Sequence, residues 1–267
     1  GYYASASGTP VNSGATDHTE CVAGRYSGNG ASQCTDCAEG FYSSAGAATC
    51  SQAAAGYYAS DGAGTGVNIA AAGYDICAAG KYSTEGATSC LSCGSGTYSN
   101  SGASQCTQVP SGGYATDASG NAVNTEAVGY AACPQGTYSS QGATACIPCA
   151  AGYFASDLGA SLCTLVNAGE FATISGTGVN SAATGYELCD AGYYSGAGAT
   201  VCTVCTSGYY SSQGANSCIQ VQAGEYAANA LSEGVDTAAT QAVNCPAGSI
   251  STSTGATSCT LCASGTY

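Results

Sequence analysis

Apolar side chains occur singly along this chain, and Gly, Ser, Thr and Ala separate them. In the stretch Cys21–Cys50, two loops of similar length each begin with Cys-x-x-Gly-x-aromatic and end with Gly-Ala-x-x-Cys. Segments such as Gly-Thr-Tyr-Ser are extended in character, and Gly-Ala is typical of a turn. The pattern therefore predicts short two-stranded β ladders and no substantial helix.

The loops belong to a tandem repeat with a period of 56 residues. Each complete repeat contains two cysteine-bounded loops and then a stretch without cysteine. We divide the chain into a partial third loop (1–20), four repeats (21–76, 77–132, 133–188 and 189–244) and a truncated fifth repeat (245–267).

The cysteine-free stretch reads as a third loop of the same kind. Its opening position holds Ala53, Val109, Val166 or Val221, and its closing position holds His18, Tyr74, Tyr130, Tyr186 or Ala242. Both cysteines are missing together. We expect a valine that recurs every 56 residues, such as Val67, and the closing tyrosine to form an apolar plug in place of the bridge.

Loss of both cysteines from the third loop favours pairing within each loop. The interleaved alternative, Cys21 with Cys37 and Cys34 with Cys50, remains open. Each bridge within a loop stabilises by roughly 3 kcal/mol in the chain-entropy model. The predicted bridges are Cys21–Cys34, Cys37–Cys50, Cys77–Cys90, Cys93–Cys106, Cys133–Cys146, Cys149–Cys163, Cys189–Cys202, Cys205–Cys218 and Cys245–Cys259, with Cys262 unpaired in this segment.

Composition excludes a sizeable single core. Leu, Ile, Val and Phe together supply only 29 of 267 residues, whereas there are 19 Cys and 40 Gly. Disulfides must then stabilise the fold, which indicates an oxidising, extracellular or cell-surface location. We expect each loop to contact only the loops before and after it. The predicted fold class is a small disulfide-rich, mostly irregular, elongated tandem-repeat array.

The formal net charge is −14, and Arg25 and Lys81 are the only cations. Nucleic acid is therefore a poor partner, because phosphate binding depends on Lys and Arg. The sequence contains neither a basic-apolar leader nor an apolar run long enough to span a membrane. We expect a mature segment that is soluble or displayed externally.

Candidate chemistry gives no catalytic residue, cofactor or metal site, and we expect no enzyme. The repeated Cys-x-x-Cys pairs, as at Cys34 and Cys37, argue against one redox centre. A four-cysteine zinc site is disfavoured by the extracellular interpretation. His18 is the only histidine, and we interpret it as a plug or surface residue.

Acidic residues and hydroxyls are the remaining candidates for ligand or modification sites. The acids in or near the third loops lack EF-hand spacing, so solvated surface is favoured over weak Ca²⁺ binding. Ser and Thr leave O-linked carbohydrate as an open alternative. The acids concerned are Asp17, Glu20, Asp75, Glu126, Glu187, Asp190, Glu233 and Asp236.

The string Cys-x-x-Gly-x-Tyr-Ser-x-x-Gly-Ala-x-x-Cys-x-x-Cys resembles the ephrin-receptor-like cysteine-rich repeats and, more distantly, the tumour-necrosis-factor-receptor and EGF-like modules. The best matches are 77–106 and 133–149. This resemblance implies an extracellular stalk with pairing of the first cysteine to the second. The long repeat and the Gly, Ala, Ser and Tyr content also resemble surface-coat or flagellar-hair proteins of protists and algae.

These observations lead to three functional hypotheses. The first is an extracellular structural protein that forms a filament, fibre or surface coat by self-association, with rows of Tyr as contacts. The alternative is the stalk of a cell-surface receptor or adhesin. A weaker alternative is an array that binds Ca²⁺ or glycans.

Overall fold

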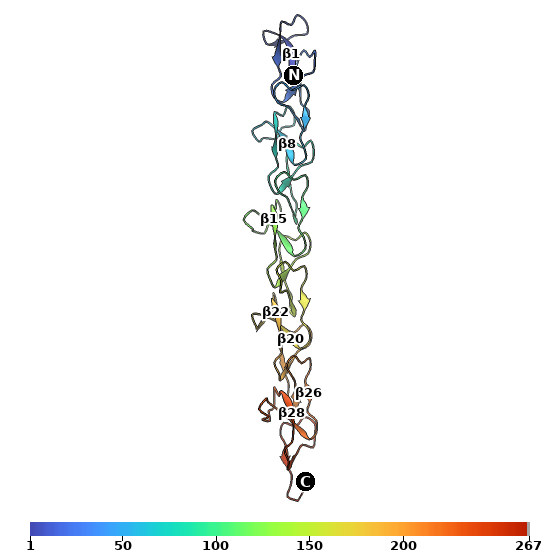
Figure 1. Ribbon diagram of the computed structural model, residues 1–267, viewed down its shortest axis with the longest axis vertical. Helices are drawn as coiled ribbons and strands as arrows, with labels where there is room; N and C mark the ends of the chain where they lie inside the picture. The colour runs from blue at the N-terminus through green and yellow to red at the C-terminus, as the bar shows by residue number, and fades with distance from the viewer. Residues whose placement is uncertain (266–267) are drawn as a thin grey trace. The chain divides into compact units, whose positions relative to one another are not determined.

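The computed structural model describes residues 1–265, so the last two residues assigned to the fifth repeat lie outside the described part. These residues form many short strands in two- and three-stranded sheets, and no helix is found among them. This confirms the predicted fold class of a small disulfide-rich protein without helix. The chain divides into two compact units, and Figure 1 shows that short strands recur along both of them. Unit 1 comprises 1–131 and 141–145, and unit 2 comprises 132–140 and the described chain from 146 onward.

The third loops carry the longer hairpins. Each of these hairpins buries small side chains of its first strand, such as Ala59 and Ala115. They are β1 (Tyr2–Ala6) with β2 (Thr9–Pro10) and β3 (Asp17–Glu20); β8 (Tyr57–Ser60) with β9 (Gly73–Ile76); β14 (Gly113–Thr116) with β15 (Gly129–Ala132); β20 (Glu170–Ile174) with β21 (Thr177–Gly178) and β22 (Gly185–Leu188); and β27 (Glu225–Ala228) with β28 (Gln241–Asn244).

Each cysteine loop instead forms a ladder of two residue pairs. The dipeptide that contains the aromatic residue pairs with the dipeptide after the closing cysteine. In unit 1 these pairs are β4 (Arg25–Tyr26) with β5 (Thr35–Asp36), β6 (Phe41–Tyr42) with β7 (Ser51–Gln52), β10 (Lys81–Tyr82) with β11 (Leu91–Ser92), and β12 (Thr97–Tyr98) with β13 (Thr107–Gln108). In unit 2 they are β16 (Thr137–Tyr138) with β17 (Ile147–Pro148), β18 (Tyr153–Phe154) with β19 (Thr164–Leu165), β23 (Tyr193–Tyr194) with β24 (Thr203–Val204), β25 (Tyr209–Tyr210) with β26 (Ile219–Gln220), and β29 (Ser249–Ile250) with β30 (Thr260–Leu261).

Disulfides close each cysteine loop on itself, from Cys21–Cys34 through Cys245–Cys259, and the interleaved arrangement does not occur among the described residues. The opening cysteine of each loop in the four complete repeats is fully buried. Its sulfur therefore serves as the apolar centre of the loop as well as a covalent link.

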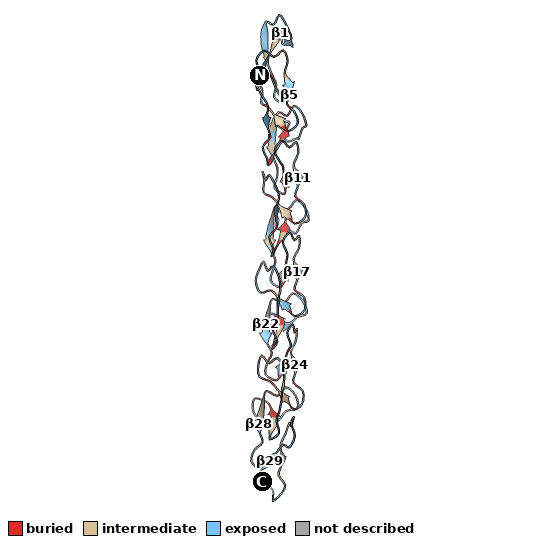
Figure 2. Cartoon of the chain, turned by 90° about the vertical axis from the view of Figure 1, so that its right-hand side faces the viewer, coloured by how far each residue is buried: buried red, intermediate tan, exposed pale blue. Residues whose placement is uncertain are grey.

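The third loops replace the bridge with small apolar clusters. In the first repeat Ala53, Ala59 and Ala71 are buried, and Val67 and Tyr42 pack against them. Equivalent clusters form around Val109, Val166 and Val221. Figure 2 shows that the buried segments are short and separated. The expected plug therefore contains the recurring valine.

The closing tyrosine was expected in the plug, and that expectation is wrong. Tyr74 is 50% exposed. It follows Gly73 on β9, where the burial alternates along the strand and turns its side chain outward. The plug needs only the small volume of Ala and Val, and the tyrosine ring lies outside it.

Successive loops are joined by a repeated set of backbone hydrogen bonds. The N–H of Ser27, six residues after the opening Cys21, donates to the carbonyl of Ala47 in the next loop. The N–H of the turn residue Gly46 donates to the carbonyl of Cys21 at 2.8 Å. The same two bonds recur at equivalent positions in both units. Backbone N–H and C=O groups that would pair within a larger sheet therefore form their hydrogen bonds between successive loops.

A third contact reaches the second loop along. A Cβ atom added to Gly56 would lie 2.1 Å from the carbonyl oxygen of Gly102, and one on Gly152 would lie 2.2 Å from that of Gly198. Both glycines have positive φ. The expectation that a loop contacts only its immediate neighbours is therefore wrong, because an opening glycine allows the backbone to approach a turn two loops away.

The third loops make this turn without glycine. Ala70, Glu126, Ala182 and Ala238 occupy the turn position, 56 residues apart, and each has a φ of 54–56°. Left-handed backbone is unfavourable for residues with a Cβ atom, by roughly 1–2 kcal/mol. The docking hydrogen bond persists, as from Ala70 N–H to the carbonyl of Cys37 at 2.9 Å. Docking between loops therefore holds the unfavourable conformation in place.

A buried serine six residues after the opening cysteine links most cysteine loops to the loop before them. Ser83 and Ser99 donate from Oγ to the carbonyls of Tyr57 and Lys81 in the preceding loop, at 2.7 and 2.8 Å. Both side chains are buried. The equivalent position in the loop opened by Cys149 holds Ala155. The serine hydroxyl is therefore a side-chain link between loops that the third loops and this one loop lack.

We predict that Gly56→Ala strongly destabilises the folded chain, because the methyl group would overlap a carbonyl oxygen and the left-handed backbone would be strained. Gly64→Ala, with φ of 92° and nothing within 4 Å, carries the strain alone, about 1–2 kcal/mol. Gly94→Ala is the neutral control, since it has neither problem. Thermal unfolding with the disulfides intact measures the loss of stability in each of the three variants. Equal losses in Gly56→Ala and Gly64→Ala would contradict the close approach.

We also predict that Ser83→Ala lowers the free energy of unfolding by about 1 kcal/mol, because the Tyr57 carbonyl loses a buried donor. The reverse change, Ala155→Ser, should supply a donor for the carbonyl of Thr137 and stabilise by a similar amount. Denaturant titration of the two variants measures both effects. Unchanged stability in Ser83→Ala, or no gain in Ala155→Ser, would contradict this role of the hydroxyl.

Candidate functional site

The predicted Cys-x-x-Cys pairs lie on opposite sides of a junction between two loops. Cys34 and Cys37 flank β5, and each bonds to a cysteine of its own loop. The two cysteines of the motif are therefore in different bridges, which is not the arrangement of a dithiol redox centre. Cys262 is the free cysteine of the described residues and is half-buried.

The other predicted candidates are dispersed. No group of three or more potential metal ligands occurs among residues 1–265. His18 lies on β3, where its ring meets that of Tyr2 edge to face at 5.0 Å between ring centres. Of the two positions expected for it, it therefore takes the outer, surface position and not the plug.

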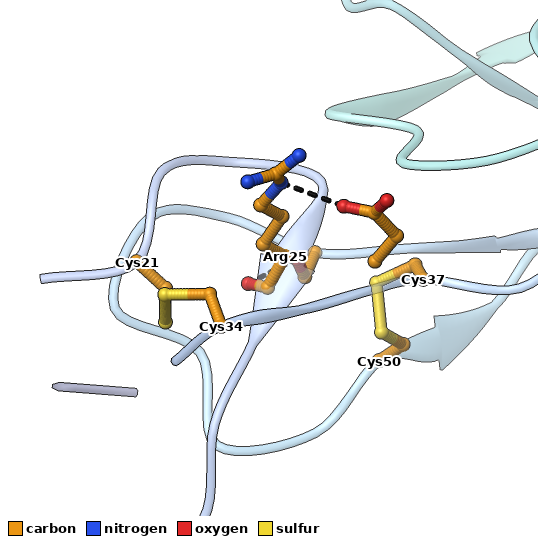
Figure 3. A network of polar contacts seen from close by, with 7 residues as sticks. Cys21, Arg25, Cys34, Cys37 and Cys50 are labelled. Atoms are coloured by element: carbon orange, nitrogen blue, oxygen red, sulfur yellow. Dashed lines mark hydrogen bonds and ion pairs between the residues drawn. A yellow bond between two sulfur atoms is a disulfide. The ribbon is translucent and has the colours of Figure 1, made fainter. Parts of the chain in front are cut away.

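Both cations make ion pairs with carboxylates. Arg25 Nε lies 2.6 Å from Asp36 Oδ1 across the β4–β5 ladder (Figure 3). The pair lies between the bridges Cys21–Cys34 and Cys37–Cys50. Lys81 Nζ lies 3.6 Å from Glu126 Oε1, and Ser92 Oγ also donates to that carboxylate. This hydroxyl and the lysine charge lower the pKa of Glu126. The remaining charge of the chain is acidic.

Asp61 and Asp117 each accept hydrogen bonds from backbone N–H groups at the tip of a third loop. Asp61 Oδ1 accepts from the N–H groups of Ala63 and Thr65, at 2.8 and 3.0 Å. These backbone hydrogen bonds lower the pKa of Asp61. Asn229 accepts from two backbone N–H groups in the same way, 168 residues later. An uncharged amide therefore performs the same structural role. The charge of Asp61 does not, by itself, indicate a ligand-binding site.

The feature that recurs on the surface is an aromatic pair. In the first three repeats the ring of the second loop meets the closing tyrosine of the following third loop. Ring centres are 4.8 Å apart for Tyr42 and Tyr74, 5.5 Å for Tyr98 and Tyr130, and 5.1 Å for Phe154 and Tyr186. All three pairs are tilted by 51–56°. Sequence spacing placed a tyrosine row here but did not predict its pairing with the second loop.

These closing tyrosines form an apolar surface with the last strand residue of the third loop. Tyr74, Tyr130 and Tyr186 are 50%, 49% and 48% exposed, and Ile76 and Leu188 are each 49% exposed. Strand alternation places Tyr74 and Ile76 on the same face of β9. We call each such group, a closing tyrosine with the residue two positions after it, an aromatic patch. It is the candidate functional site of this chain.

No protein-family model matches the chain, and comparison with curated proteins found no similar sequence. Within residues 1–265 there is no helix long and apolar enough to cross a membrane. The aromatic patches must therefore be interpreted from their own geometry. The many disulfides suggest that the protein folds in an oxidising environment.

We predict that acid loosens the tip at Asp61 and that Asp61→Asn does not show this effect. The pKa of Asp61 is lower in the folded than in the unfolded chain, so its contribution is complete above about pH 4 and is lost as pH falls through the folded pKa. Amide chemical shifts of Ala63 and Thr65 over an acid titration measure it. An unchanged titration of these amides in Asp61→Asn would contradict the assignment.

Proposed function

We propose that this chain is an extracellular structural protein that assembles with copies of itself into a filament, fibre or surface coat. The observation that carries the proposal is the recurrence of half-exposed tyrosine at the same position of successive repeats. A half-exposed aromatic ring presents apolar area and a hydroxyl to a partner, which is why tyrosine is frequent at interfaces.

Repetition of the same patch favours open assembly. A surface that recurs at a fixed period allows one copy to contact another in several registers, and contacts that do not close into a ring propagate. Weak patches become effective together, because each additional contact within a bound pair is intramolecular. The chain has only two lysine and arginine residues, which also suits contact between identical chains rather than with polyanions.

The net charge of −14 opposes this assembly. Copies of an acidic chain repel one another at low ionic strength, and salt screens that repulsion over about 8 Å at physiological concentration. The proposed function therefore includes a dependence on salt. The ephrin-receptor-like resemblance, with its stalk role, is the competing proposal, in which the same chain remains a monomeric spacer.

We expect electron microscopy of the disulfide-intact protein at physiological salt to show regular filaments or sheets that dissociate at low salt. The triple variant Tyr74→Ser, Tyr130→Ser, Tyr186→Ser should raise the critical concentration for assembly by about tenfold or more, a loss of about 1.4 kcal/mol per assembled chain. The matched control is Leu158→Ser, Val201→Ser, Leu231→Ser, which removes apolar side chains that are 70%, 70% and 78% exposed outside the aromatic patches. Monodisperse particles under all conditions would support the spacer.

A further inference from the structure

We propose that the paired tyrosines Tyr42–Tyr74 and Tyr98–Tyr130 are sites of oxidative cross-linking, in which a dityrosine bond joins the second loop of a repeat to its third loop. The cross-link would lie where the disulfide of the third loop is missing. The proposal does not depend on self-association, since both tyrosines of each pair belong to one chain.

The first argument is geometry. Tyrosyl radicals couple through the ring carbons next to the hydroxyl, so the two rings must approach with their phenol edges together. Ring centres of Tyr42 and Tyr74 are 4.8 Å apart and the planes are tilted by 51°. Two rings joined by a carbon–carbon bond lie slightly closer than this and are also twisted relative to one another. The two rings are therefore in contact at a separation and twist close to those of the product.

The tilt distinguishes this pair from the other neighbour of Tyr74. Tyr57 meets Tyr74 at 5.4 Å with planes at 80°. In that edge-to-face arrangement the rings are farther apart and nearly perpendicular, which is less like the coupled product. Tyr98 and Tyr130, at 5.5 Å and 52°, have the tilted arrangement of the first pair. The structure therefore favours two specific cross-links.

The second argument is chemical competition. The chain contains 20 Tyr but no Trp and no Met, the other side chains that are readily oxidised. Within residues 1–265 every cysteine except Cys262 is in a disulfide. Apart from the thiol of Cys262, tyrosine is therefore the side chain on which an oxidising equivalent should reside. Tyr74 and Tyr130 are half-exposed, so a surface oxidant reaches them directly.

The step needs a two-electron oxidant, for which hydrogen peroxide with a haem peroxidase is sufficient. Each phenol loses one electron and one proton, and the two radicals form one carbon–carbon bond. After coupling, each ring loses the hydrogen at the bonded carbon and regains its hydroxyl hydrogen. In total, two tyrosines and one hydrogen peroxide give one dityrosine and two waters. The protein loses two hydrogens per cross-link.

The chain contains its own control. The third pair of this kind, Phe154 with Tyr186, has a similar distance and tilt, 5.1 Å and 56°. Phenylalanine has no hydroxyl to lose a hydrogen atom, so this pair cannot couple. Phe154→Tyr should therefore create a third cross-link at a position where the native chain forms none.

The test treats dilute, disulfide-intact protein with hydrogen peroxide and peroxidase. Readouts are dityrosine fluorescence, intact mass, and peptide mapping after reduction and pepsin digestion. We expect up to two cross-links in monomeric protein, Tyr42 to Tyr74 and Tyr98 to Tyr130, and a third, from the substituted position to Tyr186, only in the variant F154Y. Tyr74→Phe should abolish the first and leave the second. The cross-linked protein should melt at a higher temperature after mild reduction than the untreated protein.

Two results would overturn the proposal. One is dityrosine spread over many tyrosines or found only between chains, which would show that pairing does not direct coupling. The other is an unchanged product from F154Y, which would show that ring proximity in this arrangement is insufficient. Both readouts are made on monomers, so failure of assembly would leave this test unaffected.

Discussion

The fold depends on a close backbone approach between opening glycines and a turn two loops farther along. Gly40, Gly80 and Gly192 all meet such a turn carbonyl at distances that a Cβ atom would not allow. Disulfides close the individual loops, but a closed loop of this size does not determine its neighbours. The glycine contact and the hydrogen bonds beside it fix how consecutive loops stack within each unit. Order between loops is therefore a property of the backbone, and side chains such as Ser83 reinforce it.

The third loop shows what happens when the covalent bond is removed and the docking is kept. Ala53, Ala59 and Ala71 fill a small volume, and Val67 covers it. Such small side chains remove little apolar area from water, so the cluster alone stabilises weakly. The loop also carries a strained turn at Ala70. It is thus the least constrained part of each repeat, and it is also the part that carries the aromatic patch and the variable tips.

The sequence was sufficient for the class of fold because the governing signals are local. Regular cysteine spacing and Gly-Ala turns predict disulfide-closed hairpins. The third loop was recognisable because Ala53 and Tyr74 stand at the positions of its opening and closing cysteines. The contacts between loops were not predictable in the same way. Ser99 and the pairing of Tyr98 with Tyr130 depend on which backbone groups face each other after stacking. Sequence spacing shows that these residues recur but does not predict their contacts. The sequence therefore predicted a row of tyrosines at 56-residue spacing, without the neighbours that form the aromatic patch.

Changes of length occur where they leave the docking surfaces untouched. The loop closed by Cys149 and Cys163 is one residue longer than its equivalents, yet Gly159 N–H still donates to the Cys133 carbonyl at 2.8 Å. The third loop after it has a tight turn at its tip, and Ala182 still donates to Cys149. Since equivalent junctions within each unit have the same geometry, insertion or removal of one whole 56-residue repeat would place familiar surfaces against each other. The length of such an array can therefore change in steps of one repeat at little cost to its folding.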